Sequence, residues 1–213
     1  MDITTWLLFM GVAIVAVISP GPAILLSISN SIRFGASKVL LSSFGNICGL
    51  LILSTAAIFG LGAILKTSTT LFLVIKLIGA TYLIYLGIRQ WRSKTNFFEG
   101  VEKESTQFKS NKRFFVEGFL IAVTNPKAIL FFTALFPQFI NMQASLVSQF
   151  LIMTFTFMAI SFVALTTYGL LAKKTKKWLS TGQRARWFNR TLGGLFVLIG
   201  VGLLQLKVDR NAL

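Results

Sequence analysis

The chain has 213 residues, 54% of them hydrophobic, and its 21 lysines and arginines against 6 acidic residues give a formal net charge of +15. With a mean hydropathy of +0.76, this length predicts a single transmembrane domain over residues 1–213, without room for a soluble module of ordinary size. The sequence contains no histidine and one cysteine, which excludes zinc sites built on histidine pairs and Ser-His or Cys-His nucleophile systems. We therefore expect neither an enzyme nor a bound metal or cofactor.

Apolar stretches long enough to cross a membrane follow one another along the chain, since a span needs roughly 20 mostly apolar residues. The longest uncharged run, residues 128–172, contains a polar stretch at 137–149 that predicts a turn between two spans. The predicted spans cover residues 5–31, 39–65, 69–91, 114–136, 147–172 and 188–207. The predicted fold is therefore an all-α integral membrane protein with six transmembrane helices. A cleaved signal peptide fits the N-terminus less well, because Asp2 stands where a signal peptide carries basic residues.

Two of these spans contain helix-breaking residues followed by the same Ala-Ile-Leu tail. The first span holds Ser19-Pro20-Gly21-Pro22-Ala23-Ile24-Leu25, and the fourth holds Thr124-Asn125-Pro126-Lys127-Ala128-Ile129-Leu130. Proline removes a backbone donor and clashes with the preceding turn, so each helix should open there. Opened backbone at membrane depth survives only where it is buried in protein or lines a wet cavity, and matched breaks in two halves of a transporter mark its substrate site.

The basic residues collect in alternate connections of the predicted topology. Residues 33–38 carry 2 of them, residues 89–113 carry 7 and residues 173–190 carry 7, whereas the other connections hold few. Because cations collect on the cytoplasmic side, both termini should lie outside and the loop at about 92–113 should be cytoplasmic. The loops lack the interleaved aromatic residues of a nucleic-acid surface. The charge thus predicts orientation in a lipid bilayer and no nucleic-acid partner.

A repeat of three spans would be inverted in this topology, because the first and fourth spans enter the membrane from opposite faces. Arg33 follows Pro22 by 11 residues, and Asn125 follows Arg113 by 12, or roughly 16 and 18 Å along a helix. Half of a hydrocarbon core is about 15 Å, so both breaks should lie near the midplane. A second match, between residues 76–84 and 190–198, also fits a 3+3 inverted repeat.

The candidate binding residues surround the two breaks. Lys127 is an intramembrane cation, which costs roughly 2.5 to 3.5 kcal/mol and indicates function. Two roles stay open for it: contact with a substrate or coupling ion, or a structural contact with the carbonyl groups freed at the first break. The backbone amides after each break should favour a carboxylate. The predicted substrate-binding residues are Pro20, Gly21, Pro22, Ala23, Asn46, Asn125, Pro126 and Lys127.

An ordered set of short motifs across almost the whole chain resembles the LysE/RhtB family of amino-acid exporters. The resemblance implies a multi-pass secondary transporter of the bacterial inner membrane that exports amino acids or related metabolites and is driven by protons. Many members carry an acidic or amide residue where this chain has Ala23, and that difference argues against a basic amino acid as substrate. The motifs are Pro20-Gly21-Pro22, Gly79-Ala80-Thr81-Tyr82-Leu83, Leu86-Gly87, Asn125-Pro126-Lys127 and Phe136-Pro137-Gln138-Phe139.

A membrane subunit with a structural or assembly role, and without transport, is the alternative. Gly45 and Gly49 form a G-x-x-x-G pair of the kind that packs helices closely, and such a face would also permit a homodimer. Small-residue faces occur in transporters and non-transporters alike. The paired midplane breaks favour transport, because a purely structural bundle has no need to open two helices at one depth.

Overall fold

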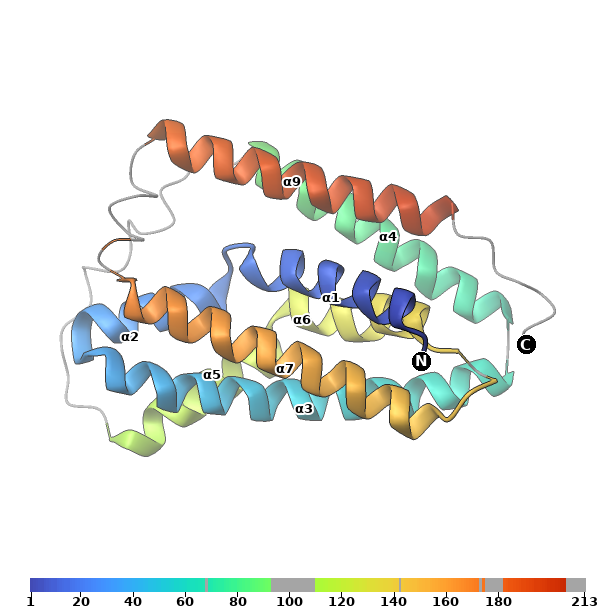
Figure 1. Cartoon of the computed structure of the whole chain (residues 1–213), viewed down its shortest axis with the longest axis horizontal. Helices are drawn as coiled ribbons and strands as arrows, with labels where there is room; N and C mark the ends of the chain where they lie inside the picture. Colours follow the sequence, from blue (N-terminus) through green and yellow to red (C-terminus); the bar gives the residue numbers. More distant parts are fainter. Residues whose placement is uncertain (68, 93–109, 142, 173, 175–181, 206–213) are drawn as a thin grey trace.

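The computed structural model describes the whole chain except residues 68, 93–109, 142, 173, 175–181 and 206–213. Its described part is helical throughout and contains no strand, so the predicted all-α fold is confirmed (Figure 1). The helices are α1 (Ile3–Ile18), α2 (Pro22–Phe34), α3 (Ala36–Thr67), α4 (Thr69–Arg92), α5 (Asn111–Thr124), α6 (Pro126–Leu130), α7 (Leu146–Leu170) and α9 (Gly182–Gln205). A π-helical turn η1 (Phe131–Leu135) and a 3-10 turn η2 (Phe136–Phe139) extend α6.

Both predicted breaks are present as bends between consecutive helices. The axes of α1 and α2 meet at 54°, and those of α5 and the segment from α6 to η2 meet at 50°. The unbroken helices α3 and α7 are each long and apolar enough to span a membrane, and each bent pair meets the same criterion when taken as one span. The structure thus supports two to four spans by length and composition, and the count of six with a 3+3 repeat stays a prediction.

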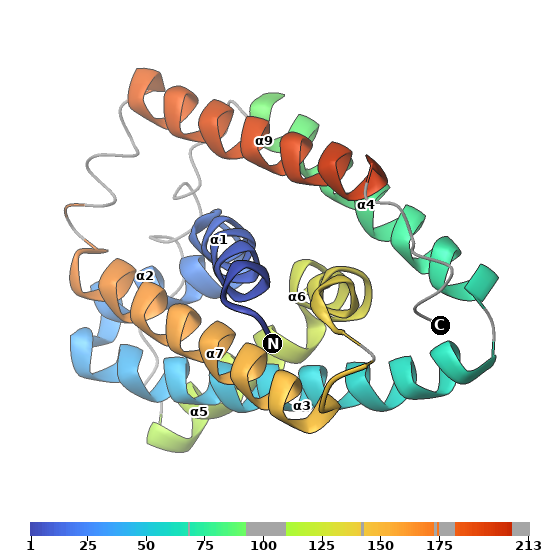
Figure 2. The ribbon, with the colours of Figure 1, turned by 45° about the vertical axis from the view of Figure 1, so that its right-hand side comes forward.

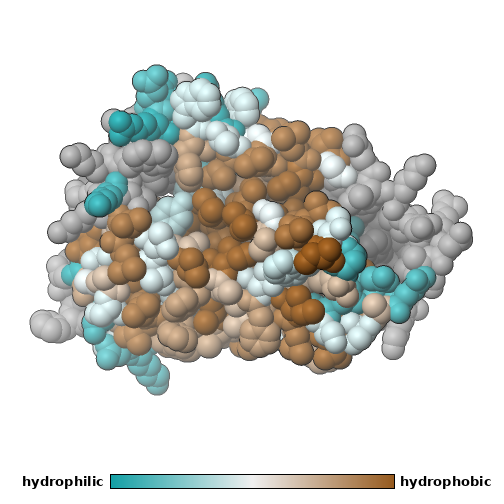
Figure 3. Space-filling model, in the orientation of Figure 1, coloured by the Kyte–Doolittle hydropathy of each residue, from teal (hydrophilic) through white to brown (hydrophobic). Residues whose placement is uncertain are grey.

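The connections between helices alternate between the two ends of the molecule. The junction of α2 with α3, the ends of α4 and α7, and the starts of α5 and α9 lie at one end, whereas the N-terminus and the turn before α7 lie at the other (Figure 1). The face in Figure 3 is hydrophobic across its middle and hydrophilic toward both ends. The described helix ends that border the three basic connections therefore lie at the same end, which we call the basic end. Most of the predicted loop at 92–113 lies outside the described residues.

Two helices run centrally between two groups of outer helices. In Figure 2, α1 and the segment beginning with α6 lie between the pair α4 and α9 on one side and α3 and α7 on the other. Residues 140–145, of which 142 is outside the described residues, connect η2 to α7. This connection is shorter than the polar stretch 137–149, which was predicted to form the turn. The difference arises because Pro137 lies in the first turn of η2, where its missing N–H costs no hydrogen bond.

Asp2, the acidic residue near the N-terminus, is the N-cap of α1. Its carboxylate accepts hydrogen bonds from the Thr5 amide at 2.8 Å and the Thr5 hydroxyl at 2.7 Å. These two bonds stabilise the carboxylate and lower its pKa from the usual value. The lone acidic residue before the first apolar run is thus a helix cap.

Glycines bring α3 and α5 into backbone contact. A Cβ atom on Gly45 would collide with the Phe115 carbonyl, and one on Gly118 would collide with the Ser42 carbonyl. A Cβ on Gly49 would lie 2.7 Å from the Ala122 side chain. The G-x-x-x-G pair therefore packs helices within one chain, as small residues do in membranes. A homodimer would need a different surface from the one that this pair suggests.

Aromatic rings fill the core at the end opposite the basic end. The rings of Phe131 and Phe157 lie 4.5 Å apart, those of Phe132 and Phe157 lie 5.0 Å apart, and Phe9 packs edge-on against Phe139 at 5.4 Å. Phe9, Phe132 and Phe157 are buried. We call the rings of Phe9, Phe131, Phe132, Phe136, Phe139 and Phe157 the phenylalanine cluster.

Candidate functional site

The first break frees carbonyl groups at the end of α1, and side chains from elsewhere bind those of Ile18 and of the C-cap residue Ser19. The Lys127 ammonium group donates to the Ser19 carbonyl at 2.7 Å. The Tyr168 hydroxyl, from α7, donates to the Ile18 carbonyl at 3.0 Å. Gly21 then begins α2 as an N-cap that offers no side-chain hydrogen bond, followed by Pro22 in the first helical position. The first break is thus stabilised by contacts from two other spans.

The second break is stabilised from within. Asn125 ends α5 and begins α6, and its side-chain oxygen accepts the Lys127 amide at 3.1 Å. Its backbone carbonyl accepts the Ile129 amide at 2.9 Å. The expectation that the amides after Pro126 are available to a carboxylate therefore does not hold for the Lys127 amide, because the Asn125 side chain at the N-cap already accepts it.

The Lys127 side chain reaches from the second break to the first. A Cβ atom on Gly21 would lie only 3.3 Å from Nζ and 3.7 Å from Cε, so the glycine leaves room for the lysine. Among the residues that the structure describes, Lys127 has no carboxylate partner, and its ammonium group binds a carbonyl instead. The structural contact that the sequence left open is therefore observed, while a contact with substrate stays a prediction.

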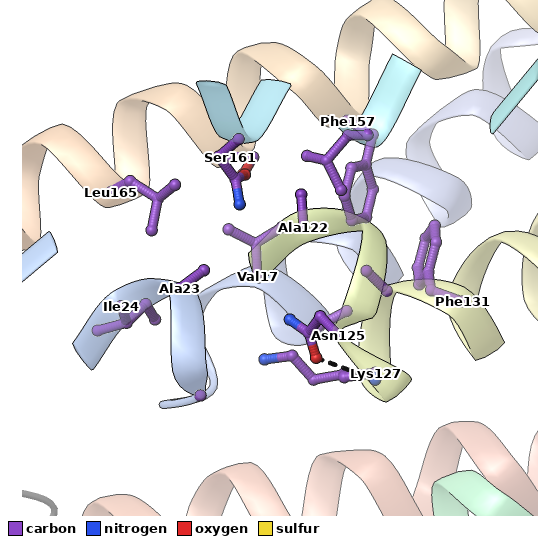
Figure 4. A pocket seen from close by; sticks show the side chains of 15 residues that line it. Val17, Ala23, Ile24, Ala122, Asn125, Lys127, Phe131, Phe157, Ser161 and Leu165 are labelled. Atoms are coloured by element: carbon purple, nitrogen blue, oxygen red, sulfur yellow. Dashed lines mark hydrogen bonds between the residues drawn. The ribbon is translucent and has the colours of Figure 1, made fainter. Parts of the chain in front are cut away.

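A cavity of about 40 Å³ lies between the two breaks (Figure 4). Its polar side chains are Asn46, Asn125, Lys127 and Ser161, and the rest of its lining is apolar and includes Phe131. This volume has room for a few water molecules and is too small for an amino acid. In this structure the cavity is therefore a small space around a polar centre and is too narrow to hold an amino acid.

Asn46 and Ser161 connect two further helices at the cavity wall. The Ser161 hydroxyl of α7 donates to the Asn46 side-chain oxygen of α3 at 3.2 Å, and both residues are buried. A buried amide that has only one such partner retains donors and acceptors that can bind a polar ligand. The pair places uncharged polar groups across the cavity from the basic side chain.

The predicted site residues divide into two groups. Gly21, Ala23, Asn46, Asn125 and Lys127 line the cavity. The three prolines, at positions 20, 22 and 126, are not among the lining residues, and the last two occupy first-turn positions of α2 and α6. The prolines therefore shape the backbone, whereas the other five predicted residues lie where a ligand could touch them.

The sequence did not reveal every residue of this region. Ser161 and Phe157 line the cavity from α7, and Tyr168 binds the first break from the same helix. Ser161 lies four residues after Phe157 in an otherwise apolar stretch, a spacing that puts both on one helix face. A serine on this helix face could therefore have been predicted as a cavity residue. No local pattern distinguishes Tyr168 from a tyrosine at the membrane interface.

The arrangement can bind an anionic group next to a small apolar volume. An ammonium group enclosed by apolar side chains interacts more strongly with a carboxylate than it would in water. No acidic residue lines the cavity, so a cationic ligand side chain would find no oppositely charged partner there. Within the described residues, no group of histidine, cysteine or acidic side chains could hold a metal ion.

Comparison with known proteins adds a family and several relatives. A family model described as LysE type translocator matches residues 14–207. A homoserine/homoserine lactone efflux protein of Salmonella typhimurium (strain LT2) is 32% identical over 203 residues, which is 95% of this chain and 97% of that protein. A leucine efflux protein of Enterobacter sp. (strain 638) is 31% identical over 197 residues, covering 89% of this chain and 90% of that protein.

A relative without a described activity shows similar likeness. An uncharacterized membrane protein of Vibrio cholerae serotype O1 is 32% identical over 207 residues, covering 97% of this chain and all of that protein. No solved structure matches the chain significantly.

Proposed function

The chain belongs to the LysE type translocator family, and from that premise we propose that it is a secondary transporter that exports amino acids or related small metabolites from the cytoplasm. The observation that carries the proposal is the cavity between the two helix breaks, with Lys127 reaching across it. Transporters with broken helices bind substrate where half-helices meet near the membrane midplane. Lys127 would bind the substrate carboxylate, and Asn46 and Asn125 would contact its remaining polar groups.

The substrate that fits best is an amino acid with an uncharged side chain. The cavity lining offers one cation, amide and hydroxyl groups, and apolar side chains from Ala23 to Phe157. Relatives carry the names homoserine/homoserine lactone efflux protein and leucine efflux protein. Both names fit a site that binds a carboxylate or carbonyl group with Lys127 and encloses an uncharged side chain.

We extend the proposal to topology and coupling. The chain would cross the bacterial inner membrane six times as a 3+3 inverted repeat, with both termini outside and the basic end in the cytoplasm. Protons would drive export. Reporter fusions after Lys94 and after Lys177 should both give cytoplasmic signals, and an external signal from either fusion would contradict the six-span topology.

Efflux from cells loaded with labelled homoserine, leucine or lysine tests the function. Cells that express the chain should release homoserine or leucine faster than cells without it, and should not release lysine faster. Lys127→Ala should lose most of this efflux, whereas Lys112→Ala, which changes an exposed lysine at the start of α5, should retain it. Equal release of all three amino acids with and without the protein would favour the structural or assembly role.

A further inference from the structure

Buried polar side chains continue from the cavity toward the basic end. On α2, Ser27 and Asn30 follow Ala23 at helical spacing, so the three share one face. On α3, Ser43 precedes Asn46 by three residues and shares its face in the same way. Ser27, Asn30 and Ser43 are each at most 2% exposed.

These faces of α2 and α3 meet against α7. The Ser27 hydroxyl donates to the Leu165 carbonyl at 2.6 Å. A Cβ atom on Gly169 would lie 2.6 Å from a methyl group of Val39 and 2.8 Å from the Ser27 hydroxyl. Val39 lies one turn before Ser43 on α3. Three helices therefore close tightly at a level between the cavity and the basic end.

Among the described residues of α2 and α3, two buried polar groups have no hydrogen-bond partner. They are the side-chain nitrogen of Asn30 and the hydroxyl of Ser43, in residues that are each 1% exposed. A buried polar group without a hydrogen-bond partner lowers the stability of the fold. Such groups are therefore rare in proteins unless they have a functional role or bind water in another conformation of the protein. A packing role alone would be filled at lower cost by apolar residues of similar size.

The other side of the cavity has a different lining. There the phenylalanine cluster fills the space between α1, α7 and the segment from α6 to η2, and its rings contact one another. Thr154 of α7 also has a buried hydroxyl without a partner, but it is a single group next to Met153, which belongs to the same apolar core. Ser54 of α3 is also buried on this side, but its hydroxyl donates to the Leu51 carbonyl. Within the described residues, the buried polar groups of α2 and α3 that lack a partner therefore lie only toward the basic end.

We propose that Ser27, Asn30 and Ser43 line the path by which substrate enters the cavity from the cytoplasm, and that this structure shows the path closed. When α2 and α7 separate, water would reach Asn30 and Ser43 and supply the partners that they lack here. The path then ends at the Asn46–Ser161 pair in the cavity wall. The identity of the passing molecule rests on the proposed export function, whereas the opening of the path does not.

Cysteine accessibility tests the proposal, and the chain suits it because Cys48 is its one cysteine. Asn30→Cys and Ser43→Cys are made with Cys48→Ala, and inside-out vesicles are treated with a membrane-impermeant cationic methanethiosulfonate. Thiols react as thiolates, which form only where water reaches. Both cysteines should react at least tenfold faster than the two controls below.

The controls lie on the same helix as Ser43. The unmodified chain presents Cys48, which is exposed on the outer face of α3 and would face lipid. Ser54→Cys with Cys48→Ala presents a position that is fully buried and hydrogen-bonded on the other side of Asn46. All variants are first checked for a monodisperse peak after extraction in detergent, so that reaction of unfolded protein is not counted.

The outcomes separate this proposal from the proposed function. If folded Asn30→Cys and Ser43→Cys react no faster than both controls, or react only in right-side-out vesicles, the cytoplasmic path is wrong. The labelling needs no substrate, so fast reaction in a protein that exports no amino acid would support the path and contradict the substrate assignment. If only one of the two cysteines reacts fast, the path does not include both helices and the proposal fails as stated.

Discussion

The two helix breaks share a bend and a sequence tail but are stabilised by different means. The bends are 54° and 50°, and Ala-Ile-Leu follows the last proline of each. The second break is closed by the side chain and carbonyl of its own Asn125. The first break depends on Lys127 and Tyr168, which come from other spans.

This difference indicates which break can move. A cap provided by a neighbouring residue follows its helix when the helix shifts, so the second break can keep its hydrogen bonds in every state. The bonds at the first break join three spans, and a shift of α1 or α7 would break them. A substrate carboxylate that binds Lys127 would also compete with the Ser19 carbonyl for the same ammonium group. The first break is therefore the expected point of response to substrate.

The largest effect is expected for Lys127→Met, which keeps most of the side-chain length and removes the cation. Efflux should fall at least tenfold, about 1.4 kcal/mol, because the substrate carboxylate loses its charged partner. Thermal stability in detergent should change little, since the lost hydrogen bond is offset by the removal of a buried charge. Efflux at the level of the unmodified chain would show that Lys127 only holds the breaks together.

A middle effect is expected for Asn125→Ala, which removes the cap of the second break. Loss of an N-cap costs about 1 kcal/mol, so thermal unfolding in detergent should move to lower temperature. Asn125→Ser provides the matched control, because serine caps a helix with its hydroxyl. If both variants unfold at the same temperature, the Asn125 cap does not stabilise the second break.

The smallest effect is expected for Tyr168→Phe, which removes one hydroxyl from the first break. A single neutral hydrogen bond contributes about 0.5 to 1.5 kcal/mol, so efflux should fall by roughly two- to tenfold. Tyr85→Phe, at an exposed tyrosine of α4, is the control. A loss of efflux far above tenfold in Tyr168→Phe would mean that this hydroxyl does more than form a single hydrogen bond at the first break.

The breaks could be predicted from sequence because proline acts on the backbone within one turn. Contacts between helices could not be predicted in this way, because they depend on the rotation of each helix about its own axis. For Lys127, contact with the carbonyl groups of the first break was therefore only one of two open roles, and Tyr168 was not assigned at all. Ser161 was missed for the same reason, since its partner Asn46 lies on another helix. The Gly45 and Gly49 pair predicted close packing, but its pattern does not distinguish a helix of the same chain from a second copy.

The glycine contacts have a mechanical consequence. Gly45 and Gly118 hold α3 against α5 with their backbones touching, and the Gly87 carbonyl would lie 2.6 Å from a Cβ on Gly193, which brings α4 equally close to α9. Each contact joins an early span to a late one. Such close crossings gain van der Waals contact that any separation of the helices would lose. The first and second halves of the chain are therefore packed together at two places, α3 against α5 and α4 against α9. A motion that exposes the cavity would then leave the pairs α3–α5 and α4–α9 in place, and α1, α2 and α7 would move relative to them.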